Sequence, residues 1–148
     1  MKKFFKDVSV KCALFMMAYY VTNSVFQSFM SLYYTDRGLD NTQIGTINAM
    51  IALVSVFFMQ FWGEMGDRAK SRNRLLALMA VAAAAFMGAY LISDMFWALL
   101  VTACLFAAFY TSLQPMGDSI ILASLAENGR RFGPVRMAGG LSFAVVAM

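Results

Sequence analysis

The chain has 148 residues, of which 61% are hydrophobic and 14% are charged, and its net charge is +4. Soluble domains average about 25% charged residues, so this composition excludes an ordinary soluble domain and favours a protein embedded in lipid. Cys12 and Cys104 lie in apolar stretches and the chain has no histidine. We therefore expect two buried free thiols, no metal site and no cofactor.

The first element follows a basic segment, MKKFFKDVSVK, that resembles the start of a signal peptide. The apolar stretch after it is too long for a signal peptide and has no small-residue cleavage site, so it predicts a retained helix. Between Lys11 and Asp118, uncharged runs of 24, 23, 19 and 23 residues follow one another. About 20 residues span a bilayer, and backbone groups in hydrocarbon must be satisfied within the helix. The sequence thus predicts an all-α integral membrane fold, with helices at about 12–35, 43–63, 75–93 and 96–126 and the start of a fifth at 135–148.

Basic residues lie almost entirely on one side of these predicted helices. Eleven of the twelve fall in the N-terminal tail, the second loop and the fourth loop, whereas the first loop holds only Arg37. The positive-inside rule therefore places the N-terminus in the cytoplasm, and we expect a multi-pass protein of the plasma membrane. Because these charges sit at helix ends and form no continuous stripe, we expect no nucleic-acid partner.

Polar residues in the first predicted helix share one face. Asn23, Gln27 and Ser31 follow one another at a spacing of four, and Thr22 lies beside them. This pattern has two interpretations. The face forms hydrogen bonds to neighbouring helices, or Asn23 and Gln27 line a substrate cavity.

The second predicted helix ends in bulky aromatic residues, and we expect Phe57, Phe58, Phe61 and Trp62 to face lipid or the membrane interface. The loop after this helix reads GEMGDRAKSRNR, from Gly63 to Arg74. In that loop we expect Asp67 to cap the start of the third helix, where its charge meets the positive end of the helix dipole.

This loop resembles the G-x-x-x-D-R-x-G-R-R signature of the major facilitator superfamily of transporters. Gly63, Asp67, Arg68 and Arg72 match the signature, whereas Lys70 replaces its second glycine and Ser71 the first of its paired basic residues. The resemblance implies that the loop is a conformational latch between helices. Charge alone would also fit a basic loop that only sets the topology.

Asp118 and Arg136 bracket the next loop, in the sequence DSIILASLAENGRRFGPVR. Asp118 lies at the membrane surface if the fourth helix ends at Gly117. If the helix continues to about Ala126, Asp118 lies inside the bundle, where a lone charge costs about 2.5–3.5 kcal/mol and needs a partner. Arg136 is the predicted partner, because its planar guanidinium suits a carboxylate or ligand hydroxyls.

The same region resembles helices four and five of the lactose permease, nucleoside and phenylpropionate proton symporter-like branch of that superfamily. Phe132, Gly133, Arg136, Met137 and Gly139 match its F-G-x-x-R-M-x-G segment, and Asp118 falls where the sugar permeases carry a glutamate. The resemblance implies that Asp118 and Arg136 bind a solute. It also implies that Phe143, in the place of a tryptophan, packs against that solute.

The resemblance covers residues 1–148 and implies the N-terminal fragment of a twelve-helix bundle whose C-terminal half is a missing partner. The implied function is proton-coupled symport of a small polar solute such as a sugar, nucleoside or aromatic acid. The alternatives are a multidrug-type efflux transporter and a nonfunctional membrane-protein fragment. A small four-helix exporter is disfavoured because the first helix has no acid. The chain shows no nucleophile, general base or phosphate-binding loop, so we do not expect an enzyme.

Overall fold

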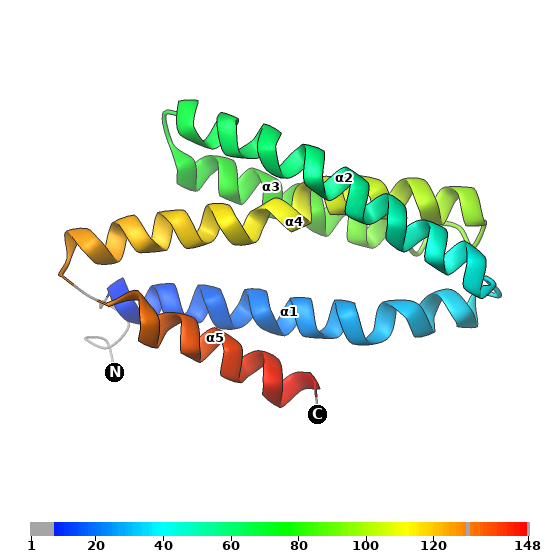
Figure 1. The fold of residues 1–148 in the computed structure, drawn as a ribbon, viewed down its shortest axis with the longest axis horizontal. Coiled ribbons are helices and arrows are strands. Elements are labelled where there is room, and N and C mark those ends of the chain that lie inside the picture. Colours follow the sequence, from blue (N-terminus) through cyan, green and yellow to red (C-terminus); the bar gives the residue numbers. More distant parts are fainter. Residues whose placement is uncertain (1–7, 130, 148) are drawn as a thin grey trace. The chain divides into compact units, whose positions relative to one another are not determined.

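The computed structural model describes residues 8–129 and 131–147, and these residues form five helices and no strand (Figure 1). The helices are α1 (Val8–Asp36), α2 (Asn41–Arg68), α3 (Arg72–Ala89), α4 (Phe96–Glu127) and α5 (Phe132–Ala147). The predicted all-helical class is therefore confirmed. Lys2, Lys3, Lys6, Arg130 and Met148, on which part of the sequence argument rests, lie outside the described residues.

Within the described part of the chain, α2, α3 and α4 are long and apolar enough to cross a membrane. α1 has 29 residues, which is sufficient length, but its polar residues, including Asn23 and Gln27, lower its hydropathy. The sequence-based prediction of four full spans thus holds by length for α1 but not by hydropathy.

The start of α2 is set by Asp40 and Gln43. The Asp40 carboxylate accepts a hydrogen bond of 2.7 Å from the Gln43 amide, and the Gln43 side chain accepts one of 3.1 Å from the Asp40 amide. This capping box satisfies two of the amides that a helix start leaves open. Just before it, Gly38 adopts a φ of 81°, which lets the chain turn sharply between α1 and α2.

The end of α2 lies further along the chain than predicted. The helix continues past Gly63 to Arg68, so Gly63, Asp67 and Arg68 are helical and are not part of a loop. The connection to α3 is only Ala69–Ser71, and Ser71 is the N-cap residue of α3. The expectation that Asp67 caps α3 is therefore wrong, because Asp67 still belongs to the last turn of the preceding helix.

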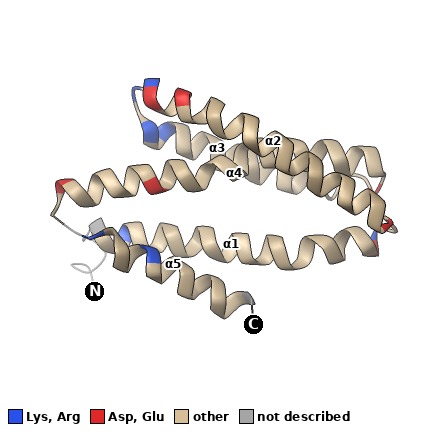
Figure 2. Ribbon diagram, in the orientation of Figure 1, with Lys and Arg blue, Asp and Glu red and all other residues tan. Residues whose placement is uncertain are grey.

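Charged residues mark the ends of the helices that meet at this connection. Figure 2 shows them at the end of α2 and the start of α3, while the middle of each helix is free of charge. α4 differs, because it carries Asp118 well inside its length and also contains Pro115. Proline has no amide hydrogen, so the Thr111 carbonyl lacks its usual donor in this helix.

The chain divides into two compact units, one formed by residues 34–117 and the other by residues 1–33 and 118–148. In the first, aromatic rings connect the helices: the ring centroid of Trp62 on α2 lies 5.3 Å from that of Phe109 on α4, and Phe86 on α3 stacks on Phe109 at 5.6 Å. Trp62 is only 7% exposed, so the expectation that it faces lipid is wrong. By contrast, Phe57 is 71% exposed, as predicted for a lipid-facing position.

The other unit packs α1, the C-terminal part of α4 and α5 around one apolar cluster. Its buried residues are Met16, Ile121, Leu125 and Val135, with Cys12, Ala13, Tyr20 and Phe132 packed against them. Figure 1 shows α1 and α5 side by side in this unit, in agreement with their contacts. This unit holds all five residues of the predicted solute site, which are Asn23, Gln27, Asp118, Arg136 and Phe143.

Candidate solute site

α4 runs without interruption to Glu127, so Asp118 lies within the helix and not at its end. Arg136 lies in the first turns of α5. An Nη atom of Arg136 donates to Oδ2 of Asp118 at 2.9 Å. The structure therefore brings together the two charges that the sequence singled out, across a turn that Gly129 makes possible with a φ of 63°.

Only one of the two oxygen atoms of the Asp118 carboxylate takes part in this contact. Its side chain is 22% exposed, and Oδ1 is buried without a hydrogen-bond partner among the described residues. A buried, unpaired carboxylate oxygen is costly and strongly favours a donor such as a hydroxyl group.

Arg136 is more open than its partner, with 50% of its side chain exposed. Its guanidinium carbon lies 5.8 Å from the centroid of the Phe132 ring, one helical turn earlier on α5. The ring face attracts the cation and restricts the side chain. Phe132 matched the sequence signature but was not predicted to touch Arg136, although the spacing of four residues on a helix favours that contact.

The other predicted site residues are placed differently. Gln27 donates to Oδ1 of Asn23 at 3.2 Å, so the two side chains are hydrogen-bonded to each other along α1. Among the described residues, no hydrogen bond or ion pair joins them to Asp118 or Arg136. Phe143 is half-buried on α5, and its backbone carbonyl accepts a hydrogen bond of 3.4 Å from the hydroxyl of Ser24.

The predicted latch residues form two separate contacts. Arg72 donates to the Asp67 carboxylate at 3.0 Å and to the Gly66 carbonyl at 3.2 Å, so it caps the end of α2 from the start of α3. Arg68 instead faces Glu64, one turn earlier on α2, at 3.8 Å, and both side chains are exposed. Nothing contacts the position that a side chain would occupy at Gly63.

Comparison with known proteins identifies the family of the chain. The model of the MFS_1 like family matches residues 8–148. The chain belongs to this family. It is a multi-pass membrane protein, and the predicted membership of the major facilitator superfamily is confirmed.

Two relatives are similar over most of the chain. An uncharacterized transporter, YwbF, from Bacillus subtilis is 31% identical over 132 residues, which is 88% of this chain and 33% of the relative. The maltose permease of Geobacillus stearothermophilus is 27% identical over 120 residues, which is 80% of this chain and 30% of the relative. The chain thus spans about one third of the length of these relatives. No solved structure matches it.

Proposed function

We propose that this chain forms part of a secondary transporter and supplies one side of its solute site, through Asp118 and Arg136. The observation that carries this proposal is the 2.9 Å contact between the two residues, on apolar helices of a transporter family. Charges inside membrane helices are costly and commonly mark solute or ion pathways.

The chemistry of the pair suits a hydroxylated solute. Oδ1 of Asp118 needs a donor, while the exposed guanidinium of Arg136 has N–H groups left to donate. Two neighbouring hydroxyl groups of one solute can satisfy both needs, because a hydroxyl both donates and accepts. The rings of Phe132 and Phe143 offer apolar faces on the same helix.

Within the predicted set of sugars, nucleosides and aromatic acids, we favour a sugar. One relative is named as a maltose permease, and sugars carry the neighbouring hydroxyl groups that the pair requires. We further propose that transport is coupled to protons and that the N-terminus lies in the cytoplasm of a plasma-membrane protein. The excess of basic residues in alternate loops supports this orientation.

The test is binding and uptake of radiolabelled maltose by the full-length protein, with and without an imposed proton gradient. Asp118→Asn and Arg136→Lys should each weaken binding by roughly tenfold or more, because a lost charge-assisted hydrogen bond costs about 1.5–3 kcal/mol. Glu127→Gln, at the exposed end of α4, is the matched control and should change nothing.

Unchanged maltose binding in both site variants would refute the binding role of the pair. Uptake that ignores the proton gradient would refute the coupling. Export of solute from loaded vesicles, without uptake, would favour the efflux alternative.

A further inference from the structure

α1 and α5 meet along a contact that we call the α1–α5 seam, formed by Met17, Tyr20 and Ser24 on α1 and by Gly139, Ser142 and Phe143 on α5. Ser24, which is completely buried, donates a hydrogen bond across it to the Phe143 carbonyl at 3.4 Å. The Ser142 hydroxyl lies 2.6 Å from the Gly139 carbonyl of its own helix and 3.4 Å from the Met17 carbonyl across the seam.

Gly139 allows α1 and α5 to approach each other closely at the seam. A methyl group added at Gly139 would lie 2.6 Å from Cδ2 of Tyr20 and 3.4 Å from Cβ of Met16. The first distance is far below van der Waals contact, and the obstacle is a ring packed against the apolar cluster of this unit. Gly140, one residue later, is exposed, and a methyl group there would meet nothing within 4 Å.

The seam lies between two of the predicted solute-site residues on α5. With 3.6 residues per turn, Arg136 and Phe143 project about 60° and 40° from Gly139 around the helix axis. They lie about 4.5 Å before it and about 6 Å after it along that axis. Any shift of α5 away from α1 at Gly139 therefore moves both side chains.

We propose that Gly139 and Ser24 are positioning residues, which fix the distance and rotation of α5 against α1 and so hold Arg136 opposite Asp118. Their importance for transport rests on the proposed function, but their geometric role does not. The seam explains why glycine is needed at position 139 and why a buried hydroxyl stands at position 24. Binding sites need this support, because geometry must be held within about 0.5 Å.

The experiment measures geometry in the full-length protein without any solute. Asp118→Cys and Arg136→Cys are combined with Cys12→Ala and Cys104→Ala, and the rate of crosslinking by a short bifunctional maleimide is recorded in membranes. With the ion pair removed, the seam must hold the two positions together. Gly139→Ala should slow crosslinking several-fold, whereas Gly140→Ala should leave the rate unchanged.

Tyr20→Ala, added to Gly139→Ala, removes the ring that the methyl group would strike and should restore most of the crosslinking rate. If Gly139→Ala does not insert stably, Ser24→Ala replaces it, with the exposed Ser28→Ala as its control. Ser24→Ala should also slow crosslinking several-fold. Equal rates in each variant and its control would overturn the proposal. Loss of maltose binding in Asp118→Asn tests the transport role separately.

Discussion

The indole N–H of Trp62 donates a hydrogen bond of 2.8 Å to the backbone carbonyl of Ala108 and thereby joins α2 to α4. Both groups are buried, and the Trp62 ring packs against Phe109. In an apolar environment an unpaired indole N–H is unfavourable, so this contact fixes which face of α2 turns inward.

Replacing this tryptophan should weaken the unit formed by residues 34–117. Trp62→Phe keeps an aromatic ring but removes the donor, and we expect the free energy of unfolding to fall by about 1 kcal/mol. Thermal unfolding in detergent measures the effect. Trp97→Phe is the control, because Trp97 is 64% exposed and should tolerate the change. Equal losses in the two variants would contradict a specific role for the Trp62 hydrogen bond.

Replacing Arg72 should destabilise the protein more than replacing its basic neighbour Arg74. Arg72→Gln removes the guanidinium that holds the Gly66 carbonyl and the Asp67 carboxylate at the α2–α3 connection. Because the group is partly exposed, we expect a loss of about 1 kcal/mol or less. Arg74→Gln removes the same charge two residues later and should leave the denaturation midpoint unchanged. A similar shift in both variants would point to net charge as the cause.

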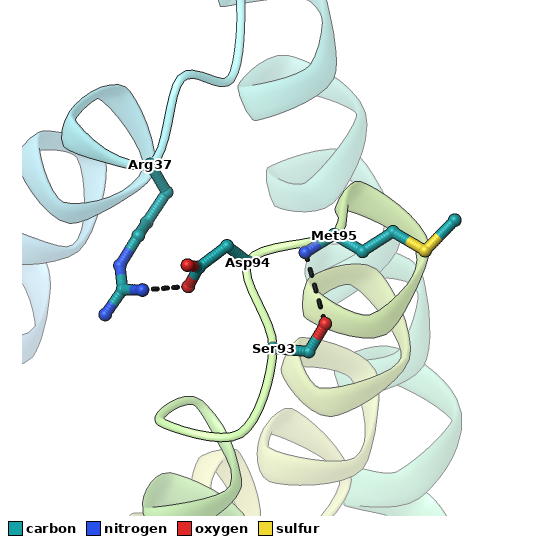
Figure 3. Close-up of polar contacts among 4 residues, drawn as sticks. All are labelled: Arg37, Ser93, Asp94 and Met95. Atoms are coloured by element: carbon teal, nitrogen blue, oxygen red, sulfur yellow. Dashed lines mark hydrogen bonds and ion pairs between the residues drawn. The ribbon is translucent and has the colours of Figure 1, made fainter.

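Arg37 and Asp94 form an ion pair between the α1–α2 and α3–α4 connections (Figure 3). Asp94 is 60% exposed, so Asp94→Asn should cost at most about 1 kcal/mol, and the cost should vanish near 1 M salt.

Nearby, the hydroxyls of Tyr34 and Tyr90 lie 3.1 Å apart and are buried. Tyr90→Phe should therefore destabilise the protein equally at low and high salt. Thermal unfolding at two salt concentrations separates the two contacts, and a salt-dependent loss in Tyr90→Phe would contradict this assignment.

The proposed orientation predicts the side on which each connection lies. A reporter enzyme that is active only outside the cytoplasm, inserted after Gly38, should be active. The same reporter inserted after Lys70 should be inactive, because that connection is flanked by basic residues. The reverse pattern of activity would overturn the orientation.

Much of the fold followed from uncharged runs, since a bilayer excludes isolated charges. The ends of helices did not follow, because a helix can continue into the membrane surface. α2 continues beyond Gly63, and the prediction therefore assigned Asp67 to a loop when it belongs to the helix. Trp62 was misplaced for another reason: with 3.6 residues per turn it lies on the same broad aromatic face of α2 as Phe57, Phe58 and Phe61, so periodicity could not separate the buried ring from the exposed ones.

The site was predictable in part. The cost of a buried charge pointed from Asp118 to Arg136, and the structure places them in contact. The pairing of α1 with α5 was not predictable from the sequence, although Gly139 belongs to a matched segment, because Ser24 and Phe143 are 119 positions apart and neither carries a charge. Asn23 and Gln27 satisfied the spacing rule by pairing with each other along one helix.

The separation between Ser24 and Phe143 in the sequence also affects the order in which their contact can form during synthesis. Ribosomes add about 5–20 residues per second, so α1 waits roughly 6–24 seconds after its own synthesis before the matching turn of α5 is made. During that interval the Ser24 hydroxyl lacks its final acceptor. The bonds from Thr22 to the Ala18 carbonyl and from Gln27 to Asn23 are local and can form as soon as α1 coils. These local hydrogen bonds can thus stabilise α1 as a separate helix before α5 is synthesised.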